Sequence, residues 1–363
     1  MKNKKFGTVF LVLLWAALVC GAWFGPVKEL SDAERRPLAQ MPEISVDSVV
    51  SGKFMEKFDD FSLDQFPLRD TFRQLKSLFH YYVLGQKDNN GIYIADGFAV
   101  QQEYPLKEES IDHALDRFNR LYEKYLTGSK VYLSIVPDKG YYLAAESGQL
   151  AMDYDRLFTR MQEGMPWASY VDITGSLSAG SYYRTDTHWR QEYLLDAAGV
   201  LCQAMGVTGP EAADYTPEKL EKPFYGVYYG QAALPMEPEP LYYLESDLLK
   251  NCTVYDFESG KTGAVYDLTK AEGKDLYEVF LSGPRSLLTI ENPKAATQRE
   301  LIVFRDSFGS AMVPLLVQDY AKVTLVDIRY VQLDVLDRFL EFQDQDVLFL
   351  YSTLVLNNSQ TIK

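Results

Sequence analysis

Residues 186–189 combine a carboxylate and an imidazole at a spacing that could support acid–base chemistry. Asp186 and His188 are two residues apart, so they face the same side of an extended segment or meet in a turn. Far along the chain, Ser307 follows an apolar run at residues 301–304. A serine, an imidazole and a carboxylate are the groups that serine-based acyl transfer uses. The chain has only 3 histidines, so a histidine inside such a pattern is a strong candidate for function.

The predicted chemistry gives each of these three side chains a separate role. We expect Ser307 to be the nucleophile, at a strand–helix junction where unpaired N–H groups and the helix dipole favour an oxyanion. We expect His188 to accept the serine proton and Asp186 to fix the histidine tautomer. Two structural alternatives remain open. Asp306 and Ser307 could cap a helix, and His188 could be a helix-start histidine held by a neighbouring acid.

The elements that must position these residues follow from the hydrophobic pattern. Nearly unbroken apolar runs are typical of strands covered on both faces, and they occur at residues 131–136, 301–304, 323–326 and 347–351. Helical patterns at residues 310–320 and 333–342 separate the last three runs. This alternation predicts an α/β fold with a parallel sheet flanked by helices. Ligands bind such sheets at the carboxyl ends of the strands, where Ser307 would lie.

The rest of the chain divides by composition and periodicity. Helices are expected at residues 54–66, 68–84, 111–126 and 189–205, and a hairpin at 91–97. Residues 211–295 are rich in Tyr, Pro and Gly and predict a β-rich insertion. The expected domains are a transmembrane anchor (1–25), a juxtamembrane linker with helices (26–85), two core parts (86–210 and 296–363) and the insertion (211–295).

The N-terminus predicts the location of the protein. Lys2, Lys4 and Lys5 precede an uncharged run at residues 6–24, close to the roughly 20 apolar residues of a transmembrane helix. Lysines on the cytoplasmic side would leave the main domain extracytoplasmic, on a single-pass cell-membrane protein. A cleaved signal peptide is the alternative, although its apolar core is usually shorter, ~7–15 residues.

Composition excludes some classes of partner. The net charge of −15 argues against nucleic acid, which rewards clustered Lys and Arg. The sequence gives little support for a metal site. His80 and His113 lie far from His188 in sequence, and no cluster of His, Cys or acidic residues has the spacing of metal ligands. We therefore predict neither a metal nor another cofactor.

Several motifs together resemble a known family. They are Glu34–Ala39 (ERRPLA), Asp64–Arg69 (DQFPLR), Val136–Lys139 (VPDK), Tyr183–Trp189 (YRTDTHW) and Asp306–Phe308 (DSF). The last two are the specific ones. In these motifs the chain resembles the DHHW family and the related alginate O-acetyltransferase-like proteins of the SGNH-hydrolase superfamily. The resemblance implies an SGNH-hydrolase-like fold, with Ser307 as nucleophile, His188 as base and Asp186 as orienting acid.

Three departures from the family pattern concern the oxyanion hole and the motif itself. Thr187 replaces the first histidine of the family name, as in alginate-type relatives. Arg305 replaces the usual glycine before Asp-Ser, and could be an oxyanion or substrate group or a salt-bridged structural arginine. Gly283 and Pro284 stand where relatives carry a Gly-Asn pair, and proline has no N–H to donate. With Arg305, Gly283 and Trp189 are the candidates for binding the oxyanion or the substrate.

The resemblance also implies an activity. The expected function is extracytoplasmic O-acetyl transfer to a cell-surface or secreted polysaccharide through an acyl-serine intermediate. A membrane-bound O-acyltransferase would be the partner that supplies the acetyl group. Two other functions remain open: a carbohydrate esterase, and a cell-envelope binding or scaffold protein with weak catalysis.

Overall fold

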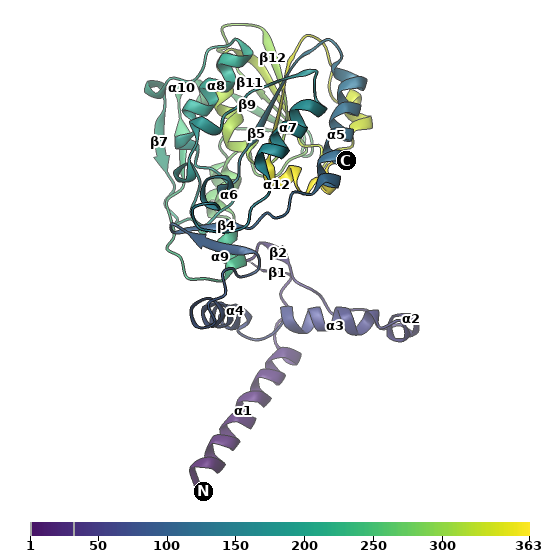
Figure 1. The fold of residues 1–363 in the computed structure, drawn as a ribbon, viewed down its shortest axis with the longest axis vertical. Helices are drawn as coiled ribbons and strands as arrows, with labels where there is room; N and C mark the ends of the chain where they lie inside the picture. The colour runs from purple at the N-terminus through teal and green to yellow at the C-terminus, as the bar shows by residue number, and fades with distance from the viewer. Residues whose placement is uncertain (1, 32) are drawn as a thin grey trace. The chain divides into compact units, whose positions relative to one another are not determined.

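The computed structural model describes the backbone of every residue except 1 and 32, and all side chains except those two and residues 2–5, 23 and 24. The chain forms two compact units. The N-terminal unit comprises Met1–Gly91 with Val227–Met236, and the sheet unit comprises Ile92–Gly226 with Glu237–Lys363. The first unit runs from purple to blue in Figure 1, apart from its green segment around α9.

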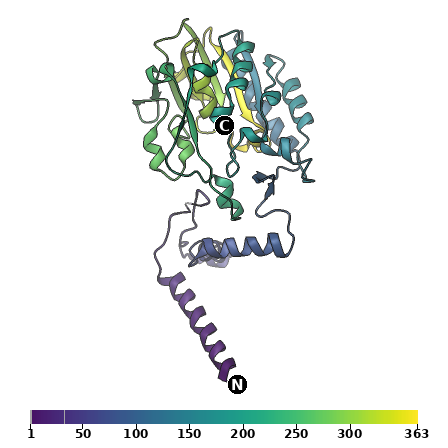
Figure 2. The ribbon, with the colours of Figure 1, turned by 90° about the vertical axis from the view of Figure 1, so that its left-hand side faces the viewer.

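An eight-stranded sheet organises the sheet unit, in the order β10-β9-β11-β13-β12-β14-β5-β6. The five strands from β13 to β6 are parallel, and β11, β9 and β10 extend them antiparallel. Figure 2 shows the strands side by side, with β14 in yellow near the middle. The strands are β5 (Lys130–Val136), β6 (Ala168–Tyr170), β9 (Thr253–Asp256), β10 (Lys261–Gly263), β11 (Leu287–Glu291), β12 (Arg299–Arg305), β13 (Tyr320–Val326) and β14 (Asp346–Ser352). The predicted α/β fold with a mostly parallel sheet is confirmed.

Both faces of this sheet are buried, as the apolar runs predicted. In β12, Leu301 and Val303 pack in one core cluster, and Ile302 and Phe304 pack in another. Successive side chains of a strand point to opposite faces, so a strand covered on both sides must be apolar throughout. Helix α8 (Leu195–Met205) covers one face, and α5 (Glu108–Leu121) and α7 (Tyr154–Gly164) cover the other (Figure 1).

Three predicted helices are shorter than expected. The segment after β12 is only α11 (Gly309–Met312) with a 3₁₀ turn at Val313–Leu316, because Pro314 lacks the N–H that a continuing α-helix would donate. Residues 333–342 form only a 3₁₀ turn, at Leu333–Arg338. The helix expected from residue 189 begins later, at α8, after a 3₁₀ turn at Gln191–Tyr193.

Part of the segment expected to be a β-rich insertion belongs to the main sheet. Strands β9, β10 and β11 lie within residues 211–295 and continue the sheet beyond β13. The segment also forms β7 (Thr216–Lys219), β8 (Tyr242–Glu245), α9 (Val227–Ala232) and α10 (Asp247–Asn251). The other elements of the sheet unit are the hairpin β3 (Ile92–Ala95) and β4 (Phe98–Gln101), α6 (Lys139–Leu143) and α12 (Thr353–Leu356).

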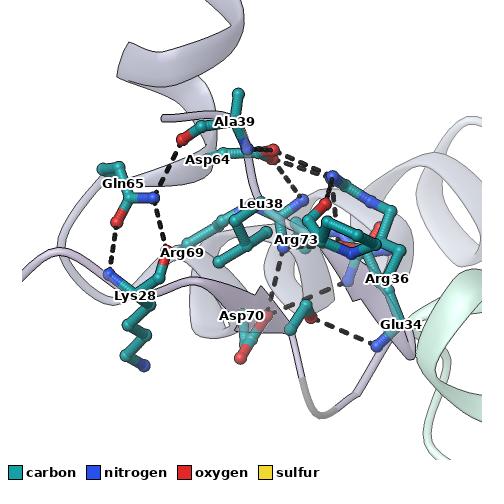
Figure 3. A network of polar contacts seen from close by, with 12 residues as sticks. Lys28, Glu34, Arg36, Leu38, Ala39, Asp64, Gln65, Arg69, Asp70 and Arg73 are labelled. Carbon is teal, nitrogen blue, oxygen red and sulfur yellow. Dashed lines mark hydrogen bonds and ion pairs between the residues drawn. The ribbon is translucent and has the colours of Figure 1, made fainter. Parts of the chain in front are cut away.

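A network of ion pairs ties together two of the family motifs in the N-terminal unit (Figure 3). Arg36 and Asp64 form a paired contact at 2.8 and 2.7 Å, and Arg69 binds both Glu34 and Asp64. The hydrogen bonds from Arg36 contribute most to lowering the pKa of Asp64 to about 2. These motifs therefore have a structural role here. The unit also holds β1 (Leu30–Ser31), β2 (Arg36–Pro37), α2 (Val46–Val50), α3 (Lys53–Asp64) and α4 (Arg69–Leu78).

The N-terminal segment forms helix α1 (Lys2–Phe24). A transmembrane helix needs roughly 20 apolar residues. Within the described part of the chain, no helix has both the length and the apolar character required to span a bilayer. The structure therefore does not support the transmembrane helix predicted at residues 1–25.

Candidate active site

The structure brings the three predicted catalytic side chains into one hydrogen-bonded chain. His188 Nδ1 lies 2.6 Å from Asp186 Oδ1, and His188 Nε2 lies 2.8 Å from Ser307 Oγ. Both distances are within hydrogen-bond reach. Because a carboxylate can only accept, Nδ1 carries a proton for Asp186, which leaves Nε2 free to accept the proton of Ser307 in the neutral ring. The geometry is thus that of a nucleophile, a base and an orienting acid.

A tight loop sets the spacing of Asp186 and His188. Tyr182 and Trp189 form an isolated antiparallel bridge, and the Tyr183 N–H donates to the His188 carbonyl at 3.0 Å. Inside this turn, the His188 N–H also donates to Asp186 Oδ1 at 3.0 Å. The carboxylate therefore binds the ring and the backbone of the same residue. Asp186 is fully buried, and the His188 side chain is 12% exposed, so the histidine keeps a small accessible surface.

The turn after β12 presents Ser307. Asp306 holds this turn, because its carboxylate accepts the Phe308 N–H at 3.0 Å and the Ser352 N–H at 2.7 Å. Asp306 therefore stabilises the turn, whereas no side-chain hydrogen bond caps α11 at Phe308, and Ser307 bonds His188. Within the described residues, the Ser307 N–H has no hydrogen-bond partner, so it can donate to an oxyanion.

Tyr277 is a site residue that the sequence did not reveal. Its ring stacks on His188 with centroids 4.0 Å apart and planes 11° apart, and Phe308 packs against the histidine at 5.1 Å. Tyr277 lies in a 3₁₀ turn, Leu276–Val279, within the segment predicted to be an insertion. Tyr277 was not among the predicted site residues, and its packing on His188 is what identifies it.

The three oxyanion and substrate candidates lie in different settings. Arg305 is buried, donates to the Asp306 carbonyl and Ser310 Oγ at 3.2 Å, and lies 3.9 Å from Asp327. The Gly283 N–H donates to the Phe280 carbonyl at 3.1 Å. Neither residue makes a described hydrogen bond to the triad.

Trp189, the third candidate, supports the serine turn. Its indole N–H donates to the Phe308 carbonyl at 3.0 Å, and its ring packs edge-on against the Phe308 ring. Trp189 is fully buried. It therefore connects the histidine loop to the turn that carries Ser307.

The remaining histidines take part in ordinary contacts. The His80 ring binds Gln86 at 2.8 Å, and the His113 ring binds the Ile362 carbonyl at 3.0 Å. Within the part of the chain that the structure describes, no group of three His, Cys, Asp or Glu side chains could hold a metal ion.

Comparisons with known proteins agree with the fold. Residues 168–326 match the family model described as "DHHW protein", a segment that contains Asp186, His188 and Ser307. A solved DHHW family protein from Eubacterium siraeum is 23% identical, with a TM-score of 0.61, over 76% of this chain and 95% of that one.

Structures of PatB1 from Bacillus cereus are also similar. The free protein is 20% identical with a TM-score of 0.55, over 73% of this chain and 96% of that one. The same protein with a sulfonyl adduct is 19% identical with a TM-score of 0.54, over 73% of this chain and 97% of that one. No curated protein matches the sequence. The resemblance to the DHHW family that the sequence motifs indicated is therefore confirmed.

Proposed function

We propose that this protein transfers an acyl group through a covalent ester on Ser307. The observation that carries the proposal is the continuous chain from Ser307 Oγ through both nitrogens of His188 to Asp186, with contacts of 2.8 and 2.6 Å. A serine hydroxyl is a weak nucleophile without an adjacent base, and this geometry supplies the base and its orienting acid.

The reaction would proceed in two balanced steps. Ser307 Oγ attacks the acyl carbonyl carbon while its proton moves to His188 Nε2, and the Ser307 N–H binds the developing oxyanion. The imidazolium then returns the proton to the departing alkoxide, which leaves an acyl ester on the serine. In the second step an acceptor hydroxyl gives its proton to His188 and attacks the ester, which regenerates Ser307.

The family resemblance supports acetyl as the group and a polysaccharide hydroxyl as the acceptor. On this proposal the sheet unit lies outside the cytoplasm, and a membrane-bound O-acyltransferase supplies the acetyl group. Protease added to intact cells should then cleave the sheet unit. Complete protection, with cleavage only after cell lysis, would contradict the extracytoplasmic location.

The test of the covalent step is acylation of the full chain. We expect incubation with an activated acetyl ester to add one acetyl mass to the peptide that contains Ser307, and no mass in Ser307→Ala. A sulfonyl fluoride offers a second probe, since a sulfonyl adduct is known for PatB1. A folded wild-type chain that neither reagent modifies would refute the proposal.

Carbohydrate esterase activity is the nearest alternative, with water in place of the acceptor hydroxyl. Adding a candidate polysaccharide to the acetylated protein separates the two. Transfer predicts acetyl on the polymer, whereas an esterase predicts free acetate at the same rate with or without it.

A binding or scaffold role is favoured by one observation. The Gly283 N–H is used by the Phe280 carbonyl, and Pro284 has no N–H to offer. Loss of one oxyanion donor costs roughly 10²–10³ in rate in enzymes of this kind. Polysaccharide binding by Ser307→Ala with wild-type affinity, together with absent acylation in the wild type, would establish this role.

A further inference from the structure

A buried lysine lies behind the loop that carries Asp186 and His188. Lys139 follows β5 in the segment Val136–Lys139 and is 2% exposed. Its Nζ donates to the carbonyl of Tyr183 at 2.9 Å and to that of Arg184 at 3.3 Å. Lysines are almost never fully buried unless they are paired, so this position calls for a specific reason.

The contacts of Lys139 fall at the base of the catalytic loop. Tyr183 is paired with His188 across the turn, since its N–H donates to the His188 carbonyl. The Arg184 carbonyl also accepts the Ala99 N–H of β4 at 2.8 Å. Fixing these two carbonyls therefore fixes the backbone that leads directly to Asp186.

Carboxylates surround the ammonium group. Burial lowers the pKa of Lys139 to about 7, and the negative charges of Asp186, Glu239 and Asp138 act in the opposite direction. Asp186 contributes the largest of these three effects. A positive charge beside Asp186 favours its ionised form, which is the form that orients His188.

The carboxylates of Asp138 and Glu239 accept hydrogen bonds from nearby backbone and side-chain groups. Asp138 caps α6 by accepting the Gly140 N–H at 2.6 Å and also binds Thr353. Glu239 accepts the Thr185 N–H at 3.0 Å. Lys139 thus lies among side chains that hold the loop on both sides of Asp186, and it adds a buried positive charge to them.

We infer that Lys139 is a positioning residue of the site, which holds the 183–188 loop through its hydrogen bonds and its charge so that Asp186 can orient His188 toward Ser307. This inference rests on the proposed acyl transfer for its kinetic consequence. Its structural consequence, an ordered hydrogen bond between Asp186 and His188, can be measured without any activity.

The experiment compares the full wild-type chain with Lys139→Met, Lys139→Arg and a matched control, Lys130→Met. Lys130 is exposed at the other end of the same strand, so its substitution removes a lysine without touching the loop. Two quantities are measured: the rate constant of Ser307 acylation by an activated acetyl ester, and the proton NMR signal of the hydrogen-bonded His188 Nδ1–H. The signal is assigned by its loss in His188→Gln.

We expect Lys139→Met to slow acylation by ~10²-fold, the effect of a small misplacement of a catalytic group, and to broaden or remove the Nδ1 proton signal. Lys139→Arg keeps the charge and should recover most of the acylation rate and of the Nδ1 proton signal. Lys130→Met should match the wild type in both measurements. A Lys139→Met protein with wild-type acylation and an unchanged signal would overturn the inference.

Two further outcomes are also decisive. If the wild type is not acylated, the proposed function fails, and the NMR signal alone still decides the role of Lys139. If Lys139→Met does not fold, Lys139→Gln replaces it, because its amide can donate to a carbonyl without carrying a charge. Wild-type signal and rate in Lys139→Gln would then refute the role of the charge.

Discussion

His188 is held from three directions, and each contact restricts a different freedom of the ring. Asp186 binds Nδ1 and fixes the tautomer, and Ser307 meets Nε2. The Tyr277 ring lies almost parallel to the imidazole, so rotation out of the line between Asp186 and Ser307 would break the stacking. The face of an aromatic ring is also electron-rich and would attract the imidazolium of the proposed acyl transfer.

This stacking predicts that the ring of Tyr277 matters and its hydroxyl does not. An aromatic contact contributes about 0.5–1.5 kcal/mol, so Tyr277→Leu should slow Ser307 acylation by up to roughly tenfold. Tyr277→Phe keeps the ring and should stay within about twofold of the wild type. The measurement is the acylation rate constant of the folded variants. Equal rates in Tyr277→Leu and the wild type would show that the stacking plays no part in the reaction.

At the scale of elements, the site combines the end of β12 with the loop at residues 183–188. A segment distant in sequence packs against this loop. The loop at residues 183–188 is contacted by Gly226, whose N–H donates to Thr185 Oγ1 at 2.9 Å. A Cβ added at Gly226 would lie 2.3 Å from both Asp186 Cβ and the Thr185 carbonyl oxygen. No side chain fits at this distance, so this close approach of two backbones requires glycine.

Gly226→Ala should therefore displace Asp186. We expect a loss of about 1–3 kcal/mol in the free energy of unfolding, typical of overpacking, and a larger relative loss of Ser307 acylation. Urea unfolding and the acylation rate measure the two effects. Gly263→Ala is the control, because nothing lies within 4 Å of a Cβ at that position. An active, fully stable Gly226→Ala protein would rule out the close approach.

At the scale of the whole molecule, the buried charge of Lys139 links stability to pH. Its pKa is lowered to about 7 by burial, whereas an unfolded lysine has a pKa near 10.4. Between these values the unfolded chain binds more protons at this position, so its contribution to stability rises with pH over that interval. Below about pH 7 the lysine is charged in both states, and this contribution is constant and unfavourable.

The free energy of unfolding of the wild type, minus that of Lys139→Met, should accordingly increase from pH 7 to pH 10. It should be flat between pH 5 and pH 6. Denaturant unfolding of both proteins at several pH values gives the difference, and subtraction removes the titration of all other groups. A difference that falls or stays constant above pH 7 would exclude a lowered lysine pKa.

The sequence alone predicted much of the fold, because buried parallel strands leave a local signal. The apolar runs at residues 131–136 and 301–304 correspond to β5 and β12. The helices after β12 and β13 were overestimated, since periodicity does not measure where a helix ends. That β9 to β11 join the main sheet was also missed, because strand pairing across distant segments has no local period.

The chemical identity of the candidate site was determined by the sequence, and its assembly by the tertiary structure. Asp186 and His188 are neighbours in the chain, so their pairing is a local property that residue types and spacing can indicate. Ser307 is 119 positions from His188, and only the packing of β12 beside the loop brings them within 2.8 Å. Tyr277 and Lys139 act through stacking and burial, which depend on segments that meet only in the folded chain. Such contacts arise from three-dimensional packing: the motif Val136–Lys139 marked Lys139 in the sequence, but not the loop whose carbonyls it binds.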